Sequence, residues 1–248
     1  MSKRTVFIVF FVLLCLAGQA PVQAAAPLVL NTSYFPPINS PDKSGFLDLL
    51  YQELFARLGI AFEIQMLPAE RALQNANAGI DDGDTCRIAG LQNTYPNLVH
   101  TSEPVMQYQM VVFSREENFQ VSGQESLAPY GLGIVTGWKI LERTTKEHAS
   151  RTMVDSADQL FRMLDQGRVE IALIERLVGM EAINRLGIKG VRILSPPFLT
   201  GDWFLYLHKK HQGLIPRIDA ELRKMKQDGT YERIRQQVLG RYEKAIVR

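Results

Sequence analysis

The sequence has few cysteines: Cys15 and Cys86 are the two among its 248 residues. Cys15 lies in the N-terminal apolar run and follows Leu14 instead of a small residue, which does not favour lipid attachment. If the N-terminal segment is removed, Cys86 alone remains, and an intrachain disulfide is then excluded. We therefore expect a hydrophobic core to supply the stability.

An excess of one charge is also lacking. The chain has 28 Lys and Arg residues against 26 Asp and Glu residues. Cleavage after Ala24 would remove Lys3, Arg4 and no acidic residue, which leaves a neutral mature chain. A neutral chain gives no electrostatic reason to expect nucleic acid or an anionic membrane as a partner.

A single long apolar run occurs, from Val6 to Ala17, and it follows the basic start Lys3-Arg4. Small residues at cleavage spacing come next, in Val22-Gln23-Ala24. This order is typical of a secretory signal, and the run is shorter than the ~20 residues that span a bilayer. We expect residues 1–24 to be a cleaved signal peptide and the mature protein to be periplasmic.

After the run, strand patterns alternate with helix patterns. Residues 28–32 fit a strand, and an apolar stripe over 45–58 fits a helix that Ser44 caps and Gly59 ends. Further strands are expected over 62–66, 108–113, 132–135, 169–174, 191–194 and 203–207. Further helices are expected from Pro68 to Gly79, from Trp138, from Ser156 to Gly167, and over 177–186, 215–227 and 231–241. This alternation predicts an α/β fold with mainly parallel sheets.

Several short motifs occur in a fixed order along the chain. They are Tyr34-Phe35-Pro36-Pro37, Gly45-Phe46-Leu47-Asp48-Leu49, Arg71-Ala72-Leu73, Asp81-Asp82-Gly83-Asp84, Ser102-Glu103-Pro104, Gly167-Arg168-Val169-Glu170 with Glu175, and Asp228-Gly229-Thr230-Tyr231. In their order and spacing, from about Leu28 to Tyr242, the chain resembles the extracellular solute-binding proteins of family 3, the periplasmic receptors of amino-acid ABC importers.

The resemblance implies a type II periplasmic binding fold, with two α/β lobes joined by two hinge strands. Lobe one would hold residues 25–112 and 197–248, and lobe two would hold the inserted residues 113–196. The solute would bind in the cleft, at the carboxyl ends of strands, and hinge bending would enclose it. The implied partners are a small polar or zwitterionic, amino-acid-like solute and the membrane permease of an ABC importer, and we expect a monomer.

Candidate ligand-binding residues in lobe one are Tyr34, Glu70, Arg71 and Arg87. Tyr34 can stack on the solute or cover the core. Arg71 is in the first turn of a helix, where the dipole disfavours a cation, so it either grips a carboxylate or pairs with Glu70 or the acidic turn. Arg87 has the same two alternatives, with Asp82 or Asp84 as partner. Between residues 88 and 114 the chain lacks the arginine that grips the α-carboxylate in the family, so an α-amino acid would need Arg71 or Arg87 in its place.

Candidates in lobe two are Thr136, Gly137, Trp138 and Glu175. The turn at Thr136-Gly137 leads from a strand into a helix, where free N–H groups attract anions. Trp138 either stacks on the solute or belongs to the core. Glu175 ends a buried strand, where it binds the solute's amino group, as the resemblance implies, or pairs with Arg176 or a neighbouring helix. Three residues near the hinge are weaker candidates: Glu103, Gln107 and Trp203.

We expect no cofactor and no metal, because His208 and His211 lack further ligands at metal-binding spacing. Cys86 is expected to be a buried structural cysteine. A binding protein is the first hypothesis. The alternatives are an enzyme similar to periplasmic cyclohexadienyl dehydratases, with Glu175 or Glu70 as the general acid, and a sensor that docks on a membrane receptor.

Overall fold

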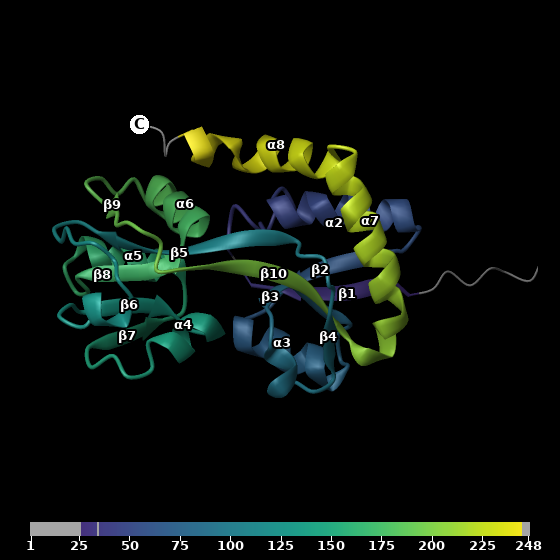
Figure 1. Cartoon of the computed structure of the whole chain (residues 1–248), viewed down its shortest axis with the longest axis horizontal. Coiled ribbons are helices and arrows are strands. Elements are labelled where there is room, and N and C mark those ends of the chain that lie inside the picture. The colour runs from purple at the N-terminus through teal and green to yellow at the C-terminus, as the bar shows by residue number, and fades with distance from the viewer. Residues whose placement is uncertain (1–25, 34, 245–248) are drawn as a thin grey trace, which may run out of the picture.

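The computed structural model describes residues 26–33 and 35–244, and its two lobes share one curled sheet (Figure 1). The strands follow the order β2-β1-β3-β10-β5-β8-β6-β7. Lobe one contains β1 (Leu28–Thr32), β2 (Phe62–Met66), β3 (Gly83–Ile88) and β4 (Leu98–His100). Lobe two contains β6 (Leu132–Val135), β7 (Arg151–Val154), β8 (Ile171–Glu175) and β9 (Arg192–Ile193). The long strands β5 (Met106–Ser114) and β10 (Leu199–His208) pass between the lobes.

The register of β5 and β10 explains how they connect the lobes. They pair antiparallel over a short middle segment, from Leu199 opposite Met110 to Trp203 opposite Met106. From Met110 onward β5 pairs with β8 of lobe two, whereas from Trp203 onward β10 pairs with β3 of lobe one. The shared segment is therefore the hinge between the lobe-one part and the lobe-two part of the sheet.

The outer strands of each lobe are parallel, as the alternation predicted: β1 pairs with β2 and β3, and β6 pairs with β7 and β8. Antiparallel pairing occurs at the two long strands and their neighbours. The carboxyl ends of the parallel strands in both lobes thus point toward the boundary between the lobes. The predicted lobe boundaries at residues 112 and 196 lie close to the lobe-two ends of the long strands and stay predictions.

Helices cover both faces of the sheet. Lobe one has α2 (Phe46–Leu58), α3 (Ala69–Ala78), α7 (Ile215–Gln227) and α8 (Thr230–Lys244). Lobe two has α4 (Lys139–Thr144), α5 (Ala157–Asp165) and α6 (Arg176–Leu186). Short 3₁₀ turns cover Leu91–Asn93, Gln124–Ser126 and Lys209–Leu214. Helix α8 runs along the top of lobe one toward α6, where the hydroxyl of Tyr242 donates to Glu181 (Figure 1).

The first helix shows how local sequence and burial act together. Leu47, Leu50 and Leu54 form its predicted apolar stripe and are fully buried. The predicted cap at Ser44 is wrong, because the helix begins after Gly45 and the Asp48 carboxylate accepts a hydrogen bond from the Gly45 N–H at 3.0 Å. A side chain at Gly45 would collide with the carbonyl of Ile38 at 2.6 Å, so the close backbone approach decides the start.

Candidate functional site

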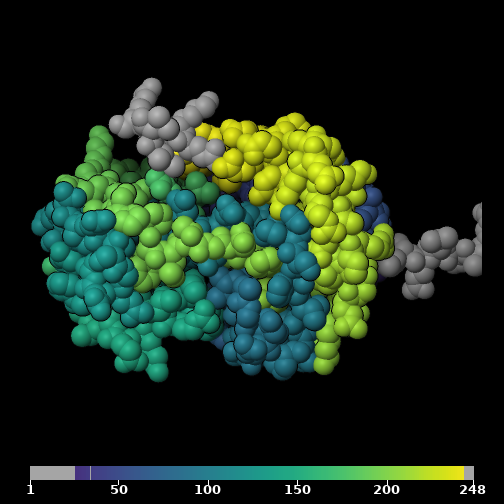
Figure 2. Space-filling view, viewed as in Figure 1, coloured from purple at the N-terminus to yellow at the C-terminus, as the bar shows by residue number. Residues whose placement is uncertain are grey.

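A small cavity lies between the lobes, next to the hinge. Its volume in this closed arrangement is about 50 Å³, room for a few water molecules, so a larger solute needs the walls to move apart. The two lobes are in contact around it, and Figure 2 shows them as one continuous body with a narrow indentation at their boundary. The residues that line the cavity are Ser33, Phe35, Cys86, Arg87, Ile88, Leu91, Met110 and Trp203 from lobe one and the hinge, and Gly137, Trp138, Lys139 and Ile140 from lobe two.

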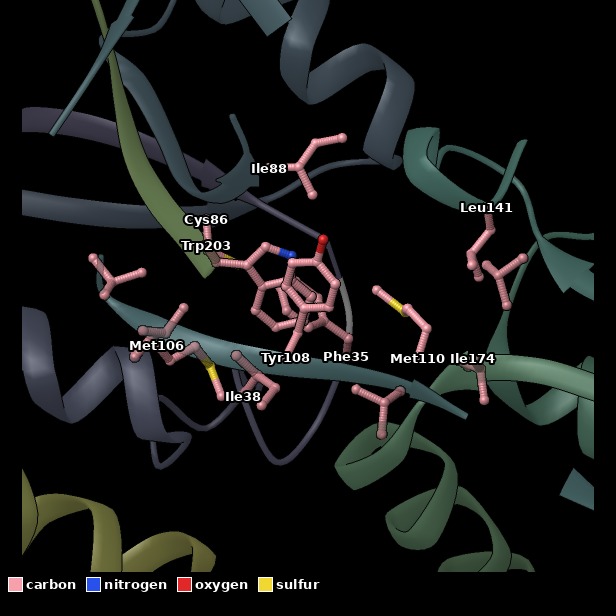
Figure 3. Packing of buried hydrophobic residues seen from close by; sticks show 14 of the residues in the cluster. Phe35, Ile38, Cys86, Ile88, Met106, Tyr108, Met110, Leu141, Ile174 and Trp203 are labelled. Carbon is pink, nitrogen blue, oxygen red and sulfur yellow. The ribbon is translucent and has the colours of Figure 1, made fainter. Parts of the chain in front are cut away.

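Aromatic rings form one wall of the cavity. Phe35, Trp138 and Trp203 meet pairwise edge to face, with ring centroids 6.2 to 6.4 Å apart. Tyr108 packs on Trp203 from the hinge strand at 5.3 Å, and Figure 3 shows Phe35, Tyr108 and Trp203 gathered over β5. Edge-to-face pairs are favoured by the ring quadrupole. Since Trp138 belongs to lobe two and Phe35 to lobe one, the cluster holds the lobes together.

Arg87 is a charged predicted residue that the structure places on the wall of this cavity. It is the penultimate residue of β3, its side chain is 13 % exposed, and it pairs with Asp84 at 2.7 Å and with the Ala69 carbonyl at 3.1 Å. Burial raises the pKa of Asp84, and the Arg87 guanidinium beside it opposes that rise. The Nε–H of Arg87 is buried and has no hydrogen-bond partner among the described residues. An unpaired buried donor costs free energy, which an acceptor on a solute would recover.

An ion pair joins the lobes beside the cavity. The Lys139 ammonium at the start of α4 contacts the Glu70 carboxylate on α3, and it also contacts Glu142 at 3.1 Å. The hydroxyl of Tyr95 donates to Glu70 at 2.9 Å. Burial favours a higher pKa for Glu70, but the bonds from Lys139 and Tyr95 outweigh it and hold the pKa of Glu70 below its usual range. Glu70 is therefore ionised, and its carboxylate is already bound by Lys139 and Tyr95 of the same chain.

Glu175 is buried at the end of β8, where it caps helix α6. Its carboxylate accepts hydrogen bonds from the N–H groups of Leu177 at 2.7 Å and Val178 at 3.0 Å. Burial raises the pKa of Glu175 to about 7 despite these bonds. It lines a second cavity of about 450 Å³ with Gln107 and Gln109. Because alternate residues of a strand point to opposite faces, this cavity lies across β5 from the aromatic one.

The structure brings together some of the predicted residues. Arg87, Gly137 and Trp138 line the aromatic cavity, as does Trp203, and Glu70 borders it through Lys139. Arg71 and Thr136 are exposed and lie outside its lining. Tyr34, like the predicted signal peptide, falls outside the described residues. As ligand-binding residues, all of these candidates stay predictions.

The turn between β6 and α4 differs from the expectation. Helix α4 begins at Lys139, not at Trp138, and the Gly137 N–H donates to the Glu142 carboxylate at 2.5 Å. The N–H group that we expected to be free for an anion is therefore satisfied within the chain. Of the weaker candidates, Glu103 pairs with Lys226 at 2.6 Å, so a structural role accounts for its charge.

Most other lining residues of the cavity were not among the predicted site residues, and Phe35, Lys139 and Met110 are the most informative of these. Phe35 and Lys139 directly follow the predicted residues Tyr34 and Trp138, so adjacency was the available signal. Met110 lies in the middle of an apolar strand, where nothing in the sequence separates a hinge residue from a core residue. The predicted burial of Cys86 is confirmed, and burial raises the pKa of its thiol, which keeps it unreactive.

No group of three or more His, Cys, Asp or Glu side chains is placed to hold a metal ion within residues 26–33 and 35–244. Over the same residues, every helix is too short or too polar to cross a bilayer.

Comparisons with known proteins agree with this geometry. The sequence pattern of the bacterial extracellular solute-binding proteins, family 3, matches residues 29–241. An uncharacterized protein of Shewanella oneidensis is 26 % identical over 92 % of each chain. An ancestral arginine-binding protein bound to arginine superposes with a TM-score of 0.75 and 19 % identity, over 88 % of this chain and 100 % of that one. A histidine kinase sensor domain with similarity to periplasmic binding proteins gives a TM-score of 0.75 and 16 % identity, over 88 % and 97 %.

Proposed function

Since the chain belongs to family 3 of the bacterial extracellular solute-binding proteins, we propose that it captures a small polar solute between its lobes and delivers it to the permease of an ABC importer. The observation that carries this proposal is the cavity beside the hinge, because both lobes supply its walls. A site whose two halves lie on separate lobes is complete only when the lobes close. Capture and closure are therefore one event.

The hinge and the lobe contacts account for such a cycle. Separation of the lobes removes Trp138 and Lys139 from Phe35 and Glu70, which opens the cavity to water. A solute that binds between them stabilises closure by its contacts with both lobes. A membrane partner can then recognise the closed form, because the surface that the two lobes form together exists only after closure.

The proposed location is the periplasm, after removal of the signal peptide that the sequence predicts over residues 1–24. A monomer suffices for this role because a single chain supplies both walls of the cavity. A dehydratase is the less favoured alternative. General acid catalysis needs a proton on the acid, and Glu70 is held ionised by Lys139 and Tyr95, while Glu175 caps α6 and lines the other cavity, away from Arg87 and Trp138.

A thermal-shift screen of polar metabolites, followed by small-angle scattering with each hit, tests the proposal. A solute at about 100 times its dissociation constant should add about 2.7 kcal/mol to the free energy of unfolding. In small-angle scattering the molecule should be compact when this solute is bound. Trp138→Ala should weaken the binding. A wide screen without any shift in melting temperature would contradict a binding role.

A sensory role is the second candidate, because a histidine kinase sensor domain has the same fold. In that case the closed form docks on a membrane receptor and no transport follows. Affinity capture of detergent-solubilised membranes, with and without solute, separates the two roles. Recovery of an importer permease favours transport, and recovery of a receptor kinase favours sensing.

A further inference from the structure

The charged side chains that line the aromatic cavity are both basic, and each is paired with carboxylates outside the lining. Arg87 and Lys139 are the charged residues among its described lining, and both are basic. The neighbouring carboxylates are already bound: Glu70 by Lys139, Asp84 by Arg87, and Glu175 by two backbone N–H groups of α6. A solute ammonium placed here would meet two cations and no unoccupied carboxylate of the described residues. An anionic group would instead meet two cations, and Arg87 keeps one donor unpaired.

Arg87 offers an anion a specific place. Its Nη2 atom holds Asp84 and the Ala69 carbonyl, while its Nε–H is buried without a partner among the described residues. A guanidinium is planar, so its remaining donors can bind a carboxylate while one donor holds Asp84. The pair with Asp84 fixes the orientation of the group before any solute arrives.

The rest of the lining favours a flat apolar body. The rings of Phe35, Trp138 and Trp203 belong to it, and so do the aliphatic side chains of Ile88, Leu91 and Ile140. Aromatic faces and edges pack best against another flat ring. A sugar or a polyamine would leave many of its polar groups unpaired against such walls.

We propose that the solute is a small aromatic carboxylate without an ammonium group, whose carboxylate binds Arg87 and whose ring packs among the rings of the cavity. This inference rests on the proposed function and narrows it, because it replaces the zwitterion that typical amino-acid receptors take. In this proposal Arg87 binds the carboxylate of the solute, and Trp138 of lobe two packs on its ring when the lobes close.

Isothermal titration with four matched compounds tests the proposal. They are 3-phenylpropanoate, L-phenylalanine, 2-phenylethylamine and hexanoate. We expect 3-phenylpropanoate to bind most tightly, L-phenylalanine at least tenfold more weakly because its ammonium stays unpaired, and 2-phenylethylamine below detection. Equal or tighter binding of L-phenylalanine would contradict the inference that the solute lacks an ammonium group. Equal binding of hexanoate would contradict the inference that the solute is aromatic.

Two variants test the role of Arg87. Arg87→Lys keeps a cation beside Asp84 but removes the planar fork, and it should weaken 3-phenylpropanoate binding about tenfold to a hundredfold. If that variant does not fold, Asp84→Asn with Arg87→Gln removes both buried charges together and should give the same loss. The control is Arg168→Lys, an exposed arginine after α5, which should bind as the wild type does. Unchanged affinity in a folded Arg87 variant would show that Arg87 does not bind the carboxylate of the solute.

The result also separates this inference from the proposed function. If L-arginine or another non-aromatic solute from the screen binds and compacts the protein while 3-phenylpropanoate does not, the binding role stands and the ligand class is wrong. If neither the screen nor the four compounds give binding, both fail.

Discussion

Gly137 of lobe two lies so close to Ala69 of lobe one that a Cβ atom on Gly137 would be 2.5 Å from the Cβ of Ala69. Real carbon atoms do not approach so closely without displacement of one side. The closed arrangement of the lobes therefore depends on the absence of a side chain at position 137. Gly137 also has a φ of 84°, which disfavours any other residue there.

Gly137→Ala should prevent full closure. Its matched control is Gly167→Ala, since Gly167 has a φ of 67° but nothing within 4 Å of an added Cβ. Both changes should cost about 1–2 kcal/mol of stability from the left-handed backbone. Only Gly137→Ala should also enlarge the radius of gyration in small-angle scattering and weaken solute binding. Identical scattering and affinity for the two variants would show that the contact with Ala69 does not control closure.

Solute capture should change the intrinsic tryptophan fluorescence. The chain has two tryptophans, and both Trp138 and Trp203 line the cavity. A solute that replaces water or rings beside them alters the polarity around both indoles. Titration of the wild type should give a saturable shift in emission, and Trp138→Phe and Trp203→Phe should each retain part of it. Binding seen by calorimetry without any emission change would argue that the solute binds elsewhere.

The ion pair between Lys139 and Glu70 should contribute little to overall stability. The two side chains are 31 % and 41 % exposed, so solvent screens their attraction. A double-mutant cycle with Lys139→Gln and Glu70→Gln should give a coupling of about 0.2–1 kcal/mol that falls in 1 M salt. Solute affinity should fall as well, because the pair joins the lobes.

A pair within one lobe provides the control for that cycle. Arg185 and Asp158 have similar exposed fractions, 34 % and 31 %, and both belong to lobe two. Asp158→Asn should change stability to a comparable extent and leave solute affinity unchanged. Equal losses of affinity from both pairs would remove the distinction between a bridge across the cleft and a surface pair.

Glu175 should make stability depend on pH. Its pKa is raised by burial to about 7 in the folded protein, from 4.5 when unperturbed. Between these values the folded state holds the proton that the unfolded state releases, so stability falls as pH rises from about 4.5 to about 7 and is constant above. The loss at that site amounts to about 3 kcal/mol.

Glu175→Gln keeps an oxygen for the N–H groups of α6 but cannot ionise. Urea unfolding at pH 5 and at pH 8 should show a smaller pH dependence for this variant than for the wild type. Glu125→Gln, at an exposed position, is the control and should behave as the wild type does. The same pH dependence in Glu175→Gln and the wild type would mean that Glu175 is ionised in the folded protein throughout.

Much of the fold could be predicted because the spacing of apolar residues along the sequence shows directly which face of a helix or strand is buried. The strands over 28–32, 62–66 and 132–135 begin and end where predicted. The predicted strand over 203–207 is part of a longer one, Leu199–His208, because Gly201 and Asp202 interrupt the apolar pattern while the backbone continues to pair with β5. Pairing partners far away in the sequence decided the length of that strand.

The sequence by itself determined the alternation of strands and helices, the motif order that identifies the family, and the identity of several residues beside the cleft, Arg87 and Trp138 among them. Only the tertiary structure decided which of those residues are free to meet a solute. Glu175 and Arg87 are both charged groups at the ends of buried strands, yet the backbone of α6 occupies the first, and the second keeps an unpaired donor. The physical reason is that a polar group is satisfied by whichever partner folding brings within hydrogen-bond distance, and those partners lie on other elements of the chain.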